Sequence, residues 1–107
     1  MSSETNLKDA ALRWLNHQPD TFAVKMWGGP YARAGMPDIL MCVRGLYIAI
    51  ELKVGDNMPT KLQSETGRRI QAAGGSWSVG RSMEDVKMIW NTAILYREAI
   101  ARSAGNG

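Results

Sequence analysis

Two apolar runs separated by Arg44 and Gly45 constrain the fold of this chain more than any other feature. Residues 38–43 read DILMCV and residues 46–53 read LYIAIELK, and both runs are rich in the branched side chains that strands favour. A short break containing glycine between two such runs predicts a tight β-hairpin. The remaining segments must then supply the layers that cover it.

Helices and two further strands are predicted around this hairpin. They are a helix over 4–16, a half-buried strand over 21–27 with its apolar side chains at Phe22, Val24 and Met26, a helix over 60–73, a short strand over 77–79 and a helix over 82–102. The order αβββαβα predicts an α/β fold with a mixed four-stranded sheet flanked by helices. Because 107 residues suffice for one core, we expect a single domain over 1–103 and a frayed tail over 104–107.

Composition limits the classes of protein to which the chain can belong. No run of residues approaches the length of a membrane span, and the N-terminal MSSETNLKDA lacks the basic and apolar stretches of a secretory signal, so we expect a cytoplasmic protein with no membrane partner. The single cysteine, Cys42, excludes an intrachain disulfide and is expected to be a small buried hydrophobe. The net charge of +3 is compatible with a polyanionic partner but does not identify one.

Three ionisable side chains are predicted to converge at the end of the hairpin. If the loop contains an even number of residues, Asp38 lies opposite Glu51 with Cβ atoms about 5 Å apart, and the two charges repel unless a cation lies between them. Lys53 shares the face of Glu51, because side chains alternate along a strand. The opposite face carries Ile48, Ile50 and Leu52.

This convergence favours a site for phosphodiester chemistry. Mg²⁺ takes oxygen ligands, often one or two carboxylates together with water and substrate phosphate, and Mn²⁺ is expected to substitute for it. Lys53 would hold the attacking water or the phosphate, or act as the base, and the sequence does not choose between these roles. A purely structural interpretation also exists, in which Glu51 and Lys53 are charges that protect an edge strand from aggregation.

Several short motifs run through nearly the whole chain. They are Gly35-Met36-Pro37-Asp38 before the hairpin, Ile50-Glu51-Leu52-Lys53 at its end, Thr60-x-x-Gln63 at the start of a helix that closes at Ala73-Gly74-Gly75, and Glu4 in the first helix. In these motifs the chain resembles the virus-type replication-repair nuclease (VRR-NUC) domain of the PD-(D/E)XK nuclease superfamily. The resemblance implies a restriction-endonuclease-like core, divalent-metal-dependent cleavage of DNA and, for short stand-alone members, homodimers that act on branched DNA such as four-way (Holliday) junctions.

The resemblance also implies roles for individual residues. Glu4, Asp38 and Glu51 would be metal ligands, and Asp38, Glu51, Lys53 and Gln63 would form the catalytic set. Two of these residues have a second interpretation. Glu4 is also a first-turn acid that favours the helix dipole, and Gln63 also completes a capping box with Thr60.

Basic residues outside the catalytic set are candidates for contacts with DNA phosphates, although a solvated surface explains each one singly. They are Lys25, Arg33, Lys61, Arg68 and Arg69. The last helix also carries a second apolar line at Met88, Leu95, Tyr96 and Ala99. This line predicts a homodimer interface or, alternatively, packing against the first helix.

The site residues and the resemblance together predict a Mg²⁺-dependent endodeoxyribonuclease with no nucleotide cofactor, and the resemblance implies branched DNA as its substrate. An intracellular, phage-encoded enzyme fits the resemblance. The alternative is a non-catalytic DNA-binding or replication-accessory module with the same fold. The two functions differ in whether DNA is cut when Mg²⁺ is present.

Overall fold

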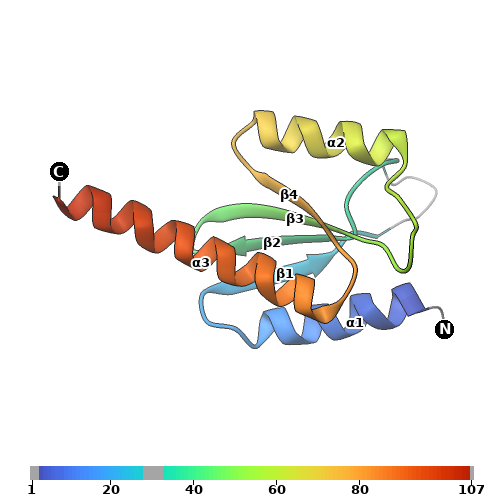
Figure 1. Ribbon diagram of the computed structural model, residues 1–107, viewed down its shortest axis with the longest axis horizontal. Coiled ribbons are helices and arrows are strands. Elements are labelled where there is room, and N and C mark those ends of the chain that lie inside the picture. The colour runs from blue at the N-terminus through green and yellow to red at the C-terminus, as the bar shows by residue number, and fades with distance from the viewer. Residues whose placement is uncertain (1–2, 28–32, 107) are drawn as a thin grey trace.

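A mixed four-stranded sheet forms the middle layer of the molecule (Figure 1). The computed structural model describes residues 3–27 and 33–106. In chain order the elements are α1 (Ser3–Asn16), β1 (Thr21–Lys25), β2 (Ile39–Val43), β3 (Leu46–Leu52), α2 (Lys61–Ala72), β4 (Ser76–Gly80) and α3 (Met83–Asn106). The strand order is β1-β2-β3-β4, with β4 parallel to β3 and the other neighbours antiparallel. The predicted α/β architecture and element order are confirmed.

The hairpin between β2 and β3 turns at Arg44 and Gly45. Both residues have positive φ, 49° and 85°, as a two-residue type I′ turn requires. The turn fixes the register, so that Val43 pairs with Leu46 and Ile39 pairs with Ile50. The same register, continued by one residue, places Asp38 opposite Glu51.

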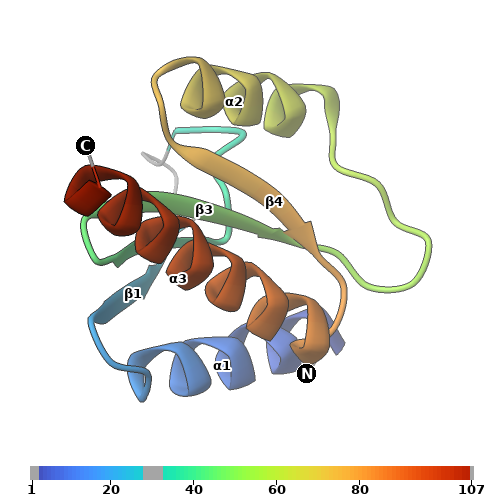
Figure 2. The same cartoon turned by 60° about the vertical axis from the view of Figure 1, so that its left-hand side comes forward.

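Helices cover the two faces of the sheet separately (Figure 2). On one face, α1 and α3 pack against each other and enclose the core with Ile39, Ile50 and Leu52, all fully buried. On the other face, α2 packs on β3 and β4. Helix and sheet pack tightly at Gly67, where an added Cβ would lie 2.3 Å from Cδ2 of Trp77 in β4.

The edge strand β1 buries the opposite set of side chains from the set that the sequence predicted. Ala23 is buried, whereas Phe22 is 69% exposed and Val24 is 40% exposed. The cause is α1, whose Asn16 side chain both donates to and accepts from the backbone of Ala23 at 2.9 Å, so that a small residue must lie beneath the helix. The prediction of a strand was correct, but the prediction of which side chains it buries was wrong.

Cys42 is also exposed, contrary to the expectation of a buried thiol. It pairs with Phe22 on one side and Tyr47 on the other, so the three side chains form a row across β1, β2 and β3. Because α2 contacts β3 and β4, this part of the sheet extends beyond the helix. The apolar run around Cys42 therefore correctly indicated a strand, but the face of the strand that carries Cys42 is not covered by a helix.

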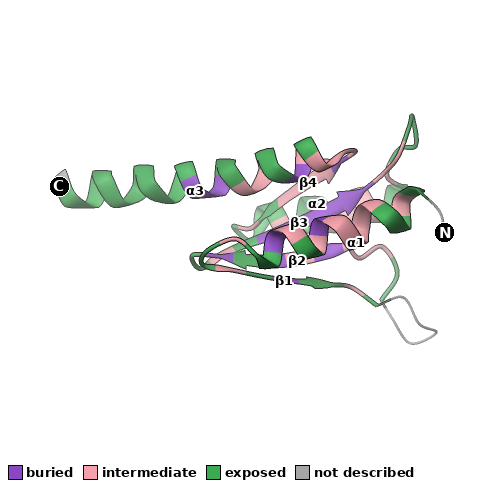
Figure 3. Cartoon of the chain, turned by 90° about the horizontal axis from the view of Figure 1, so that it is seen from below, coloured by how far each residue is buried: buried purple, intermediate pink, exposed green. Residues whose placement is uncertain are grey.

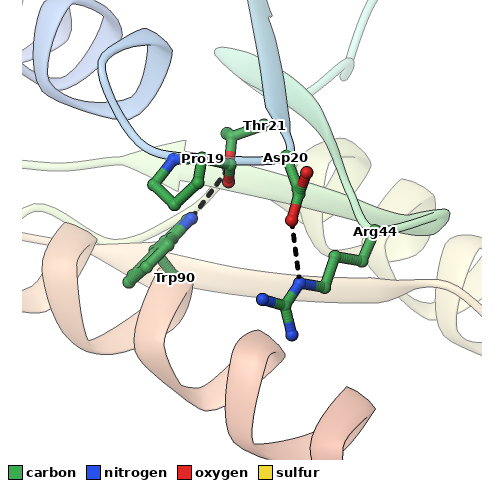
Figure 4. Close-up of polar contacts among 5 residues, drawn as sticks. All are labelled: Pro19, Asp20, Thr21, Arg44 and Trp90. Carbon is green, nitrogen blue, oxygen red and sulfur yellow. Dashed lines mark hydrogen bonds and ion pairs between the residues drawn. The ribbon is translucent and has the colours of Figure 1, made fainter.

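The connection from α1 to β1 is tied to the hairpin and to α3 (Figure 4). Asp20 has a φ of 55°; its carbonyl accepts a 3.0 Å hydrogen bond from the amide of Arg44, and its carboxylate pairs with the guanidinium at 3.1 Å. The indole of Trp90 donates a 2.8 Å hydrogen bond to the hydroxyl of Thr21. These contacts stabilise the end of the sheet that lies away from Asp38 and Glu51.

The last helix, α3, projects beyond the body of the molecule at its C-terminal end (Figure 3). It contains 24 residues and continues to Asn106, past the expected end near Arg102, and it includes Gly105. Its C-terminal half projects beyond the sheet and is exposed on all sides. Gly107 lies outside the described residues. Within residues 3–27 and 33–106, no helix has both the length and the apolar character needed to cross a bilayer.

Candidate active site

Glu51 is the one charged residue buried in the core of the described chain, with 1% of its surface exposed. It lies near the end of β3, on the face covered by α2, while its neighbours Ile50 and Leu52 point into the core beneath α1 and α3. Oε1 accepts a 2.9 Å hydrogen bond from Nε2 of Gln63. Oε2 is buried and has no hydrogen-bond partner among the described residues.

Asp38 is held beside Glu51 from two sides. Oδ2 accepts a 2.8 Å hydrogen bond from the backbone amide of Leu52, and Oδ1 lies 3.4 Å from Nζ of Lys8 in α1. The carbonyl of Asp38 accepts a 2.8 Å hydrogen bond from the amide of Met26, which continues the pairing of β1 with β2. The carboxylate is therefore held by a backbone amide of β3 and paired with a lysine of α1.

The surroundings of Glu51 raise its pKa from 4.5 to about 8. The largest cause is burial, followed by the negative charge and close approach of the Asp38 carboxylate. The charge of Glu4 adds a smaller increase, and the positive charge of Lys53 acts in the opposite direction. Four ionisable groups thus act on one another at this end of the sheet, including the predicted trio of Asp38, Glu51 and Lys53.

Gln63 completes a capping box and also contacts Glu51, so the two interpretations of this residue are compatible. Its backbone amide donates to the hydroxyl of Thr60 at 3.1 Å, and its side-chain oxygen accepts from the backbone amide of Thr60 at 2.8 Å, which completes a capping box. The side-chain nitrogen remains free to donate to Glu51. The start of α2 is therefore fixed and joined to the buried carboxylate by one side chain.

The loop between Lys53 and α2 is held by an arginine that the sequence did not single out. The backbone amide of Lys53 donates to the carbonyl of Gly80 at 3.1 Å. The next residue, Arg81, donates from Nη1 to the carbonyls of Gly55 and Asn57 at 2.9 Å and 2.7 Å. The segment after β4 thus supports both Lys53 and the chain that follows it.

The donor set at this end of the sheet fits a small divalent cation. Among residues 3–27 and 33–106, no three His, Cys, Asp or Glu side chains are close enough to share a metal, so Glu4 does not join the two carboxylates as a third ligand here. Asp38 and Glu51 nevertheless form an oxygen pair with one buried oxygen, Oε2, that has no partner. Mg²⁺ commonly binds through one or two carboxylates and completes its shell with water and phosphate.

The candidate DNA contacts are spread beyond the carboxylates. Lys61, Arg68 and Arg69 are exposed along α2, and Lys61 lies at the end of the helix nearest Gln63. Arg69 lines, together with Arg33, a groove of about 570 Å³ beside the start of β3. Lys25 is exposed at the end of β1, paired with Ile39. All five lie at the surface, and Arg33 and Arg69 line one groove.

Sequence reasoning missed Lys8, although a signal for it was present. Lys8 lies one helical turn after Glu4 and one turn before Ala11, which is fully buried. A lysine on the buried line of a helix needs an anionic partner. The position of Lys8 on this line, like that of Glu4, therefore predicts a partner of opposite charge.

Comparisons with solved structures agree with this fold. The mixed sheet and its flanking helices form a restriction-endonuclease-like fold. A structure named "VRR_NUC domain" superposes with a TM-score of 0.70 at 21% identity and covers 83% of this chain and 95% of its own. A second, named "VRR_NUC domain protein", gives 0.66 at 16% identity and covers 86% and 88%.

The chain therefore has the fold of a VRR-NUC domain. No protein-family model matches the sequence, and no curated protein is significantly similar to it. Because the identities to the two structures are low, their likeness extends to the fold alone. The chemistry of the site is set by the geometry of this chain's own residues.

Proposed function

We propose that this chain is a divalent-metal-dependent endonuclease that hydrolyses phosphodiester bonds in DNA. The observation that carries the proposal is the pairing of the buried Glu51 with Asp38, whose side chain is 18% exposed, with the pKa of Glu51 raised to about 8 and Lys53 beside it. Placing a second acid against a buried carboxylate costs stability, so such a pair favours a functional role. The VRR-NUC fold makes nuclease chemistry the consistent interpretation.

Asp38 and Glu51 would hold the metal, with Glu4 as a further ligand or a nearby charge. Mg²⁺, for which Mn²⁺ would substitute, supplies neutralisation of the phosphate and activation of a water. Gln63 orients Glu51 by binding Oε1, and the amide of Leu52 orients Asp38 by binding Oδ2. Lys53 holds the attacking water or the phosphate, or acts as the base.

The proposed substrate is branched DNA, including the four-way (Holliday) junction. Support for a DNA partner comes from the exposed basic side chains on α2 and from the net charge of +3. They would contact phosphates on either side of the scissile bond. A preference for branched DNA depends on how many active sites the oligomer presents to one DNA molecule.

A homodimer would present two such sites. Along α3, Met88 is 66%, Leu95 55% and Tyr96 58% exposed, so these side chains do not pack against α1. Together with Tyr47, Met88 and Tyr96 line a groove of about 440 Å³ between α3 and the sheet. An exposed apolar face of this kind is typical of a subunit interface, and a twofold dimer orients its two sites with opposite polarity. Light scattering would show a dimer for the native chain and a monomer for Tyr96→Glu.

A substrate panel tests the proposed activity. Purified protein is incubated with labelled four-way junction, flap, duplex and single-stranded DNA, with Mg²⁺, with Mn²⁺ and with EDTA. We expect metal-dependent cleavage that Glu51→Ala and Lys53→Ala reduce by about 100-fold or more. The matched control is Arg97→Ala, an exposed position on α3.

Two results would contradict the proposal. One is undiminished cleavage by both variants, which would indicate a contaminating nuclease. The other is tight binding of DNA with no products in either metal, which would support a non-catalytic DNA-binding or replication-accessory module. Cleavage of RNA would redirect the substrate class without changing the site.

A further inference from the structure

Lys8 lies on the side of α1 that faces the core, and its partner in this structure is the carboxylate of Asp38. It shares a line of α1 with Ala11 and Leu15, both fully buried. Its ammonium lies 3.4 Å from Oδ1 of Asp38, and the side chain is 26% exposed. Lys8 therefore directs its charge at Asp38 and remains partly exposed to solvent.

The balance of charge at the site depends on whether a metal is bound. Without metal near neutral pH, the raised pKa of Glu51 keeps a proton on its carboxyl, so the formal negative charges of Glu4 and Asp38 balance the formal positive charges of Lys8 and Lys53. A divalent cation that displaces this proton adds two positive charges, removes one and leaves one positive charge. A phosphodiester group carries one negative charge and would restore neutrality.

We propose that Lys8 holds Asp38 in the metal-free protein and turns to a phosphate of the DNA when a divalent cation binds Asp38. This inference rests on the proposed function. Lysine suits the exchange because its ammonium is a compact charge on a flexible stem, which changes partner by rotation of side-chain bonds. Lys8 is then a competitor of the metal in the free protein and a substrate contact in the complex.

Metal affinity tests the first half of the inference. The binding of Mg²⁺ and of Mn²⁺ to the free protein is measured by calorimetry for wild type, Lys8→Gln, Lys8→Arg and Arg102→Gln. Removing the competing charge in Lys8→Gln should tighten metal binding by about threefold or more. Lys8→Arg and Arg102→Gln, whose position is exposed on α3, should bind as wild type.

DNA affinity tests the second half. Binding of a labelled four-way junction is followed by fluorescence anisotropy between low and high salt, with Ca²⁺ in place of Mg²⁺ to slow cleavage. Losing one phosphate contact should flatten the slope of log affinity against log salt by about 0.9. Lys8→Gln should show this change, while Lys8→Arg and Arg102→Gln should keep the wild-type slope.

The outcomes separate this inference from the proposed function. An active wild-type enzyme whose Lys8→Gln variant binds metal no more tightly, or keeps the full salt slope, would overturn the inference alone. Wild-type protein that neither binds nor uses a divalent metal would overturn both. Circular dichroism monitors folding; if Lys8→Gln unfolds, an Lys8→Arg variant with much weaker metal or DNA binding would also overturn the inference.

Discussion

Gln63 joins the first turn of α2 to the buried carboxylate of Glu51 through one amide group. Its oxygen accepts from the backbone of Thr60 at 2.8 Å, and its nitrogen donates to Oε1 of Glu51 at 2.9 Å. The same side chain therefore sets the position of a helix and the orientation of a candidate metal ligand. Substitutions that separate the two roles reveal how much each contributes.

The substitution Gln63→Glu should separate them. Glutamate also completes a capping box, so α2 should remain folded. It replaces the donor to Glu51 with a second negative charge, which raises the pKa of Glu51 further and weakens its function as a ligand. We expect a thermal midpoint close to wild type and cleavage at least about tenfold slower.

The comparison variant is Gln63→Ala, which loses both hydrogen bonds and should lower the free energy of unfolding by about 1 kcal/mol as well as the cleavage rate. Thermal unfolding and single-turnover cleavage measure the two effects. A Gln63→Glu protein that cleaves DNA at the wild-type rate would show that the contact with Glu51 is not needed.

The raised pKa of Glu51 predicts how stability depends on pH. Between pH 4.5 and about 8 the folded chain binds more protons at Glu51 than the unfolded chain does. The free energy of unfolding of the metal-free protein should therefore fall as pH rises through this window. Because Mg²⁺ competes with that proton, metal affinity and cleavage should instead increase toward pH 8.

Urea unfolding in EDTA at several pH values, together with Mg²⁺ titrations at the same values, checks both trends. Glu51→Gln is the control, since it is neutral at every pH and should lose this part of the slope. It should be more stable than wild type at about pH 8 without metal, and inactive with it. Identical pH dependence in the two proteins would exclude Glu51 as the titrating group.

The position of the central pair followed from the sequence because the hairpin turn determines register. A two-residue turn at Arg44 and Gly45 leaves one pairing for Asp38, and strand parity then separates Glu51 from Leu52. These relations are local. They depend on neighbouring residues and not on how distant elements pack.

The features that could not be predicted from the sequence depend on contacts between distant elements. Phe22 and Cys42 have the apolar character of buried residues, but α2 covers only the other half of the sheet. Lys8 reaches Asp38 because α1 packs against β1 and β3 on either side of β2, and Arg81 reaches the loop after Lys53 because β4 runs parallel to β3. Sequence periodicity shows which face of a helix or strand is apolar, but it does not show which other element packs against that face.

Close packing at Gly67 predicts that α2 tolerates no side chain there. A Cβ would lie between 2.3 Å and 2.7 Å from three ring atoms of Trp77. Gly67→Ala should therefore lower the free energy of unfolding by about 1–3 kcal/mol, although alanine favours helices. Since α2 must shift, the contact of Gln63 with Glu51 should lengthen and cleavage should slow.

The matched control is Gly105→Ala, the same change in a helix where nothing lies within 4 Å of the added atom. It should leave stability unchanged or slightly higher. Chemical unfolding and cleavage assays compare the two. Equal midpoints for both variants would show that α2 accommodates the methyl group without cost.

Arg81 provides the last prediction, because it binds the loop that joins Lys53 to α2. Its guanidinium donates to two loop carbonyls, of Gly55 and Asn57, and its own amide donates to the carboxylate of Asp85 at 2.8 Å. Arg81→Ala removes the side-chain bonds and leaves the backbone bond in place. The backbone amides of residues 55–58 should then exchange with deuterium faster, and cleavage should slow by about tenfold.

Lysine at this position separates charge from geometry. Arg81→Lys keeps the positive charge but lacks the planar fork that reaches two carbonyls, so it should restore only part of the wild-type exchange rate and activity. Arg97→Ala, an exposed change on α3, should alter neither. If the loop amides exchanged at the wild-type rate in Arg81→Ala while cleavage fell, the guanidinium would act on the substrate directly. If both stayed at wild-type values, the loop would be held by its own backbone turn, in which the amide of Asn57 donates to the carbonyl of Val54 at 3.3 Å.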